Sequence, residues 1–170
     1  MTSGVLVFSR LNSTRLPGKA LMKIAGITLV DRVLDKLEGV MGISRTIVAT
    51  TESYLDDPLV AHLETRGTDV FRGSIDDVAL RAVCCARHYG LDYFVRVSGD
   101  SPFIDSGLIN KALLEYQNGC FDLVTNVFPR SFPNGASVEV IGTSSLKRLL
   151  SLTQDPYDRE HVTPYFYKNP

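Results

Sequence analysis

The chain has 170 residues, of which 44% are hydrophobic and 22% are charged. This composition is ordinary for a globular protein, and the length suits one domain with a sizeable core. A formal net charge of −1 argues against general binding to nucleic acid, which requires a basic face. No apolar run approaches the ~20 residues of a membrane-spanning helix, and the N-terminus lacks a signal-peptide pattern. We therefore expect no membrane association.

The cysteines indicate a reducing compartment. Their spacing fits neither a disulfide framework nor a zinc site, and two of them, Cys84 and Cys85, are adjacent. Helical spacing predicts that this adjacent pair fills the core. We therefore expect the protein in the cytoplasm, where thiols stay reduced.

The first element is a short apolar run, VLVF at 5–8, which is typical of a strand buried on both faces. A cation-rich loop follows it. The loop residues suited to contact phosphate are Arg10, Ser13, Thr14, Arg15, Gly18 and Lys19. Cations and hydroxyls bind phosphate oxygens, and glycine allows a positive φ. The alternative is a solvated basic loop; the position of the loop after a strand, at the ligand edge of a parallel sheet, favours a triphosphate site.

The loop matches neither of the common glycine motifs for phosphate. Lys19 is followed by Ala20, no glycine lies five residues before Gly18, and no GxGxxG fingerprint is present. We therefore expect phosphate recognition through side-chain cations rather than through a glycine-rich backbone.

Strands and helices alternate along the rest of the chain. The predicted strands are 46–49, 69–72, 93–97, 123–125 and 138–141. The predicted helices are 28–37, 57–66, 74–89, 105–118 and 144–152, with caps at Thr28, at Asp57 before Pro58, at Ser74 with Asp77 as a capping box, and at Asp105. This alternation predicts an α/β fold with a mostly parallel sheet and helices on both faces.

The fourth strand, 93–97, leads directly into Gly99 and Asp100. An aspartate at this point lies at the sheet edge that the 10–19 loop also occupies. Because Mg²⁺ takes one or two carboxylates plus substrate phosphates, Asp100 is a candidate metal ligand, and Gly99 leaves room for a nucleotide. The alternative is a turn aspartate bonded to its own backbone. The basic loop opposite favours the metal site.

Other charged positions leave alternatives open. Asp77 suits a helix cap, whereas Asp76 and the segment 72–74 leave the third strand at the ligand edge and are candidates to line the pocket. Arg96 lies inside the fourth strand, where a buried cation needs a partner. That partner is either a structural carboxylate or a bound ligand.

Six motifs occur in order along the chain: RLNSTRLPGKAL, VATT, FRGSIDDV, RVSGDSPFID, FPNGASVEV and DPYDREHVTPY. Together they resemble the cytidylyltransferases of spore-coat-polysaccharide biosynthesis, relatives of the enzymes that make CMP-activated 3-deoxy-octulosonate and sialic acid. The resemblance covers essentially all of the chain. It implies a nucleotide-diphospho-sugar transferase fold (GT-A-like, Rossmann-like), CTP and Mg²⁺ as ligands, and a sugar or sugar-acid hydroxyl as acceptor. The preference for CTP follows from the resemblance alone.

The resemblance also implies residue roles. It assigns catalysis to Arg10, Arg15, Lys19 and Asp100, with Asp100 on the metal. It places Thr50, Thr51, Arg72, Gly73 and Ser74 near the base and ribose, and Asn126, Pro133, Gly135, Glu139, Arg159 and His161 on the sugar side. Without the family, the simpler interpretations are a capping or packing histidine at His161 and a solvated strand residue at Glu139.

Three departures from the family pattern bear on activity. Phe8-Ser9 stands where Gln-Ala is usual, and Asn134 and Ser137 replace two usual aspartates. Family members also commonly continue past the point where this chain ends. We therefore expect a single nucleotidyltransferase-like domain, 1–170, without the family's C-terminal region, from which relatives in the wider superfamily take a second metal carboxylate.

Two functions remain as hypotheses. The chain is either a Mg²⁺-dependent enzyme that transfers CMP from CTP to a sugar or sugar-acid hydroxyl in polysaccharide biosynthesis, or a catalytically impaired nucleotide-binding module of the same fold. A nucleotide-sugar-dependent glycosyltransferase is disfavoured, because Gly99-Asp100-Ser101 is not an Asp-x-Asp motif. Relatives often dimerise around the sixth strand, which leaves a homodimer open. No nucleic-acid or membrane partner is expected.

Overall fold

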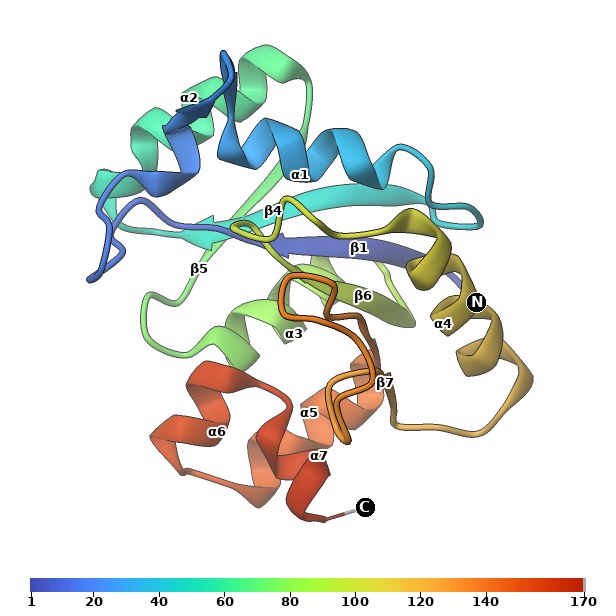
Figure 1. Ribbon diagram of the computed structural model, residues 1–170. Helices are drawn as coiled ribbons and strands as arrows, with labels where there is room; N and C mark the ends of the chain where they lie inside the picture. The colour runs from blue at the N-terminus through green and yellow to red at the C-terminus, as the bar shows by residue number, and fades with distance from the viewer. Residues whose placement is uncertain (170) are drawn as a thin grey trace.

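A six-stranded sheet runs through the middle of the computed structural model, which describes residues 1–169 (Figure 1). Its strands are β1 (Ser3–Phe8), β4 (Arg45–Thr51), β5 (Asp69–Gly73), β6 (Tyr93–Ser98), β7 (Leu123–Thr125) and β8 (Glu139–Gly142). Their order in space is β5-β4-β1-β6-β8-β7. The first four run parallel, and β8 pairs antiparallel with both β6 and β7. The prediction of a mostly parallel sheet is confirmed.

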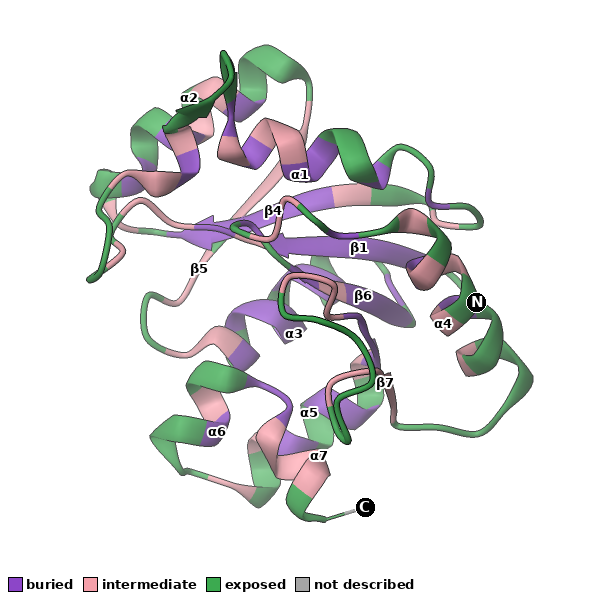
Figure 2. Ribbon diagram, viewed as in Figure 1, coloured by how far each residue is buried: buried purple, intermediate pink, exposed green. Residues whose placement is uncertain are grey.

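Helices cover both faces of the sheet, as predicted. They are α1 (Leu29–Leu37), α2 (Asp57–Arg66), α3 (Val78–His88), α4 (Ser106–Asn118), α5 (Thr143–Leu152), α6 (Pro156–His161) and α7 (Pro164–Lys168). Val5 and Val7 of β1 pack with α1, α2 and α4, whereas Leu6 packs with α3 and α5. This division follows from the two-residue period of a strand. Figure 2 shows β1 and β6 buried between the two helical layers.

The strand order changes direction between β1 and β6. From β1 the chain proceeds to β4 and β5 on one side, and then crosses to β6 on the other side of β1. In open parallel sheets, ligand crevices lie beyond the carboxyl ends of the strands at such a switch point. The segments that follow Phe8 and Ser98 therefore border one crevice.

Most helix starts follow the predicted caps. The Thr28 side chain accepts a hydrogen bond from the Asp31 amide at 3.2 Å, and Asp105 accepts one from the Leu108 amide at 2.9 Å. Helix α3 begins later than predicted, at Val78, because Asp77 is its cap. Capping at these positions satisfies backbone N–H groups that have no partner inside the helix.

Two local predictions were wrong. The capping position of α2 is Asp56 rather than Asp57, and Asp56 makes no side-chain cap bond. Its carboxylate accepts hydrogen bonds from β4 instead. Cys84 is exposed and only Cys85 lies in the core, because neighbouring helical residues point about 100° apart.

Several short elements were not predicted. They are the 3₁₀ turns Lys19–Leu21 and Tyr54–Asp56, the hairpin of β2 (Lys23–Ile24) and β3 (Ile27–Thr28), and the helices α6 and α7. Each is too short for hydrophobic periodicity to reveal it. Two residues of helix α6, Glu160 and His161, border the crevice. Over the described part of the chain, no helix has the length and apolarity needed to cross a membrane.

Candidate functional site

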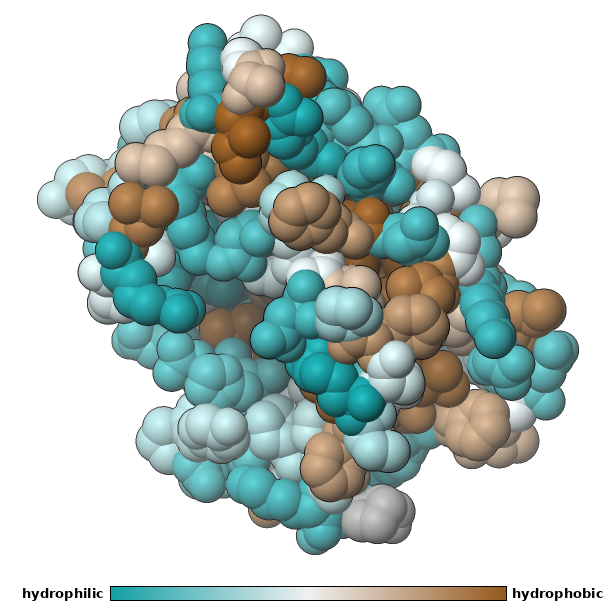
Figure 3. All heavy atoms as spheres, in the orientation of Figure 1, coloured by the Kyte–Doolittle hydropathy of each residue, from teal (hydrophilic) through white to brown (hydrophobic). Residues whose placement is uncertain are grey.

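A cleft of about 270 Å³ opens at the carboxyl ends of β1 and β6. Figure 3 shows a hollow there, bordered mainly by hydrophilic residues. The predicted site residues that line it are Arg10, Ser13, Thr14, Arg15, Lys19, Gly99, Asp100 and His161. The cationic loop and the aspartate after the fourth strand thus share one cleft, as the strand order requires.

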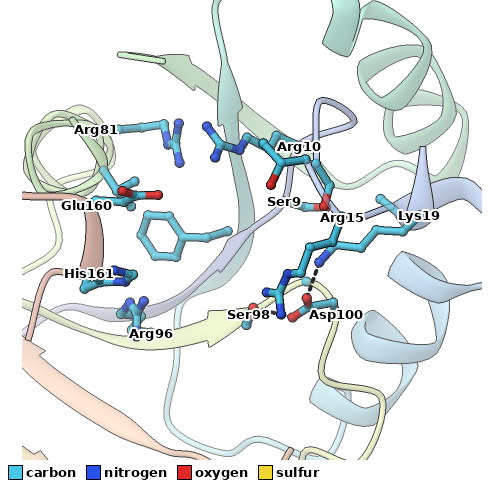
Figure 4. Close-up of a pocket in the computed structure, with 16 residues that line it drawn as sticks. Ser9, Arg10, Arg15, Lys19, Arg81, Arg96, Ser98, Asp100, Glu160 and His161 are labelled. Atoms are coloured by element: carbon cyan, nitrogen blue, oxygen red, sulfur yellow. Dashed lines mark hydrogen bonds and ion pairs between the residues drawn. The ribbon is translucent and has the colours of Figure 1, made fainter. Parts of the chain in front are cut away.

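Lys19 and Asp100 meet directly across this cleft (Figure 4). The Lys19 Nζ forms an ion pair with Asp100 Oδ2, while the Ser98 hydroxyl donates to Asp100 Oδ1 at 2.6 Å. Burial raises the pKa of Asp100, but the hydrogen bonds from Lys19 and Ser98 lower it by more, so the pKa lies below its usual value. Asp100 is therefore an ionised carboxylate whose two oxygens both have partners.

Two glycines shape the rim of the cleft. Gly18 has φ +74° and lies just before the 3₁₀ turn that carries Lys19, so it adopts the positive φ that glycine allows. Gly99 is buried, and a Cβ added to it would lie 2.7 Å from the Ser9 Cβ. The absence of a side chain at Gly99 therefore lets the loops after β1 and β6 pack together.

Arg81 is a cleft residue that sequence reasoning missed. It comes from the first turns of α3, is 3% exposed, and lies with Phe8 and Val78 in the cleft wall. Its guanidinium carbon lies 5.8 Å from the centroid of the Phe8 ring. The signal was present in the sequence, because an arginine between the core positions of a helix is a buried cation that needs a partner.

Helix α6 supplies the far wall of the cleft through Glu160 and His161. Arg159 does not reach the main cleft; its Nη1 pairs with Asp77 Oδ2 at 2.8 Å. Arg159 also donates to the carbonyls of Leu150 and Thr153. These bonds hold α6 against the start of α3 and the end of α5, so Arg159 fixes the positions of Glu160 and His161. Glu160 was not predicted, although it lies inside a recognised motif.

Thr50 and Thr51 lie outside the cleft, at the buried end of β4. They are 0% and 2% exposed, and both hydroxyls donate to Asp56 Oδ2. The other oxygen, Oδ1, accepts from the Leu11 amide at 2.7 Å. Asp56 therefore ties the start of the cationic loop to the end of β4.

The segment Arg72 to Ser74 also lies beside the cleft rather than in it. Arg72 is exposed and binds the Thr51 and Ser53 carbonyls and the Asp57 carboxylate. A Cβ on Gly73 would lie 3.0 Å from the Arg81 Cγ. The Ser74 carbonyl accepts from Arg81 Nη1 at 2.8 Å. Gly73 and Ser74 thus position Arg81.

The remaining predicted sugar-side residues do not line the cleft. The Asn126 side chain donates to the Ala136 carbonyl and accepts from the Val138 amide, both at 2.8 Å, so it closes the loop between β7 and β8. Gly135 lies in that loop with φ +92°, against the Phe103 side chain. Pro133 accepts from the Ala136 amide at 3.2 Å. This loop is held together by its own hydrogen bonds.

Glu139 is a buried partner for Arg96 rather than a solvated strand residue. It is 3% exposed, and its Oε2 lies 2.5 Å from Arg96 Nη1. Tyr167 donates to its other oxygen, and burial together with the charge of Glu139 raises the pKa of Tyr167 to about 12. Of the two partners considered for Arg96, a structural carboxylate is the one observed, although Arg96 also lines the cleft.

Among the described residues, two carboxylates line the cleft: Asp100 beside the cationic loop and Glu160 on the α6 wall. Asp100 is the one that lies next to Lys19. Over residues 1–169, no group of three or more His, Cys, Asp or Glu side chains is placed to hold a metal ion. These side chains do not suit a metal site in which the protein supplies all of the ligands. They suit Mg²⁺, which keeps several waters and binds one or two carboxylates together with substrate phosphates.

Comparison with known proteins agrees with this geometry. Residues 4–170 match the Cytidylyltransferase family. A solved cytidylyltransferase of Leptospira borgpetersenii serovar Hardjo-bovis is 35% identical and superposes with a TM-score of 0.93, covering 99% of this chain and 72% of that one.

Two further relatives extend the comparison. The spore coat polysaccharide biosynthesis protein SpsF of Bacillus subtilis is 29% identical over 97% of this chain and 70% of its own length. The structure of CMP:2-keto-3-deoxy-manno-octonic acid synthetase complexed with CTP shares the fold, with a TM-score of 0.77 at 16% identity over 99% of this chain and 86% of that chain. The fold, the cleft and the family match agree, and the chain belongs to the cytidylyltransferase family.

Proposed function

We propose that this chain transfers CMP from CTP to a hydroxyl of a sugar or sugar acid and releases pyrophosphate. One observation carries the proposal: Arg10, Arg15 and Lys19 from a single loop line the same cleft as Asp100. Cations of this kind bind a triphosphate, and the carboxylate suits the metal that accompanies it. Membership of the cytidylyltransferase family and the similarity to SpsF support the choice of reaction and substrate class.

The reaction needs positioning and charge stabilisation rather than a protein nucleophile. The acceptor hydroxyl attacks the α-phosphorus of CTP, an oxygen–phosphorus bond forms, and the bond to the pyrophosphate oxygen breaks. The hydroxyl proton leaves to solvent or to a nearby base. Lys19, Arg15 and Arg10 would stabilise the charge that builds on the α-phosphate and on the leaving pyrophosphate. Ser13 and Thr14 would donate to phosphate oxygens.

A divalent cation would be held by Asp100 together with the phosphates, where it neutralises charge and orients the triphosphate. For Asp100 to bind it, the Asp100 carboxylate has to exchange Lys19 for the metal. A phosphate is a suitable new partner for Lys19. We infer that the acceptor binds on the α6 side of the cleft, because His161 and Glu160 line that wall.

The test is pyrophosphate release from CTP and Mg²⁺ with a panel of sugars and sugar acids, together with calorimetric measurement of CTP binding. Lys19→Ala and Asp100→Ala are expected to lower turnover by about a hundredfold or more. Lys36→Ala, on the exposed face of α1, is the matched control. Wild-type turnover in either cleft variant would remove that residue from the mechanism.

A nucleotide-binding module without turnover is the second candidate. It is favoured by the single carboxylate at the metal position and by Asn134 and Ser137 at positions where relatives usually have aspartate. CTP binding without pyrophosphate release across the whole panel is the result that would select it.

A further inference from the structure

We propose that Arg81 and Arg10 form a second oxyanion site in the cleft, separate from the Lys19–Asp100 end. Figure 4 shows the two guanidinium groups pointing toward each other at the opposite side of the cleft from Asp100. The site would take a phosphate of the nucleotide or a carboxylate of the acceptor. The inference rests on the proposed function, because the oxyanion belongs to a substrate of that cleft.

The first observation is an incompletely satisfied buried charge. Arg81 is 3% exposed, and its Nε has no hydrogen-bond partner among the residues that the structure describes. Its Nη1 donates to the Ser74 carbonyl at 2.8 Å. Among residues 1–169, no carboxylate forms an ion pair with Arg81. The Asp56 and Asp77 carboxylates act on this charge without forming an ion pair with it among the described residues. Burying a charge without an anion in direct contact is costly, so a ligand that supplies one would bind strongly.

The second observation is that a like charge faces this group. Burial and the charge of Arg10 lower the pKa of Arg81 to about 10, against a smaller opposing effect of the Asp56 and Asp77 carboxylates. Arg10 makes only a 3.4 Å contact with the Ile75 carbonyl, and over the described residues it too forms no ion pair. Two guanidinium groups that face each other repel. An oxyanion between them would convert this repulsion into two charge-assisted contacts.

The surroundings of Arg81 hold it in place. The Phe8 ring packs under its guanidinium at 5.8 Å, and Gly73 leaves room for its side-chain stem. Arg96 lies over the same ring at 6.0 Å, but its charge is already paired with Glu139. Arg96 therefore forms part of the cleft wall. Over the described residues, the cleft arginines that form no ion pair are Arg10, Arg15 and Arg81, and of these Arg10 and Arg81 face each other (Figure 4).

A purely structural role explains only part of this arrangement. The bond from Arg81 to the Ser74 carbonyl would fix the turn between β5 and α3. It would not explain why Arg10 points at Arg81. The Glu160 carboxylate lies on the same side of the cleft (Figure 4), but over the described residues it forms no ion pair with either guanidinium. A guanidinium fork matches the two oxygens of a carboxylate or phosphate, and a second cation strengthens that contact.

The test measures binding, so it does not depend on turnover. Calorimetry would compare CTP, cytidine and 3-deoxy-manno-octulosonate as probes on the wild type, Arg81→Met, Arg81→Lys and Arg10→Met. Arg87→Met, on the exposed side of the same helix, is the matched control. Thermal unfolding of each variant shows whether it is folded. Should Arg81→Met fail to fold, Arg81→Lys and Arg10→Met carry the test.

The two sources of the oxyanion give different results. If the oxyanion is a nucleotide phosphate, Arg81→Met lowers the affinity for CTP about 10- to 100-fold and leaves the affinity for cytidine unchanged. If the oxyanion is an acceptor carboxylate, Arg81→Met leaves the affinity for CTP unchanged and lowers the affinity for 3-deoxy-manno-octulosonate by a similar factor. In either case Arg81→Lys binds the affected ligand less tightly than the wild type, because lysine lacks the forked donor geometry of a guanidinium.

Unchanged affinities in the folded Arg81 and Arg10 variants would overturn the inference. If the affinities of these variants are unchanged and the wild type releases pyrophosphate normally, the proposed function still holds. Conversely, CTP binding that depends on Arg81 in a protein that releases no pyrophosphate would overturn the proposed function and support this site.

Discussion

Lys19 and Asp100 neutralise each other across the cleft, although one comes from the loop after β1 and the other from the loop after β6. The proposed reaction needs both groups for other partners, Lys19 for phosphate and Asp100 for a cation. The ion pair is partly exposed, so its contribution to folding stability is small. In the proposed reaction, the main consequence of this ion pair is that Lys19 and Asp100 would be released together, Lys19 to phosphate and Asp100 to the cation.

This exchange predicts that metal and nucleotide bind cooperatively. Mn²⁺ titration followed by electron paramagnetic resonance is expected to show tighter binding in the presence of CTP than in its absence. Lys19→Met removes the competing cation, so Mn²⁺ should bind the nucleotide-free variant several-fold more tightly than the wild type. Equal Mn²⁺ affinity in the two nucleotide-free proteins would show that Lys19 does not restrict Asp100.

Asp56 predicts how stability depends on pH. Burial raises its pKa, but hydrogen bonds from Thr51, the Leu11 amide and Thr50 lower it by more, so it lies below the ordinary value of 3.8. A carboxylate with a depressed pKa stabilises the fold above the unfolded pKa and loses that contribution as the pH falls through the folded one. Asp56→Asn is expected to lower the free energy of unfolding by about 2 kcal/mol at pH 7.

The measurement is urea unfolding at several pH values. The difference between the wild type and Asp56→Asn should shrink below pH 3.8, the ordinary value for this group, because the wild-type carboxyl becomes protonated there. Asp57→Asn is the neighbouring control; that carboxylate is exposed and pairs with Arg72. A difference that stays constant down to pH 2 would contradict the assigned role of the charge.

The meeting of the cationic loop and Asp100 could be predicted because it depends on strand order, and rules for parallel sheets constrain strand order strongly. The location of Thr50 and Thr51 could not. Both are the last residues of β4, at the ligand edge of the sheet, yet their hydroxyls point at Asp56. No local pattern specifies which polar side chain a buried carboxylate takes as partner, since the choice depends on tertiary packing.

The wall formed by α6 escaped prediction for a different reason. A helix of six residues has too few turns to show an apolar face. Its position is set by the Arg159–Asp77 ion pair and by bonds to two carbonyls. The motif that contains Arg159 was recognised, but the role observed for this residue is to hold α6 in place.

A substitution at Arg159 is therefore expected to separate nucleotide binding from turnover with the acceptor. Arg159→Ala should raise amide hydrogen exchange in α6 and α7, because it removes the bonds that hold α6 to α3. Turnover should fall, since Glu160 and His161 lose their positions, while CTP affinity stays near that of the wild type. Arg148→Ala, which breaks the exposed pair with Asp122, is the control. Unchanged exchange in α6 would mean that other contacts hold this helix.

Gly99 predicts a defect that a second substitution repairs. In Gly99→Ala the new Cβ would lie 2.7 Å from the Ser9 Cβ and 2.9 Å from its Oγ, so the loop that carries Asp100 has to move. A displacement of about 1 Å at the metal position is expected to lower turnover about a hundredfold. Ser9→Gly removes both clashing atoms and leaves a 3.0 Å approach to the Phe8 carbonyl. The double variant should therefore recover much of the lost turnover, whereas Ser9→Gly alone should cost little. Additive losses in the double-mutant cycle would show that the defect of Gly99→Ala does not arise from this contact.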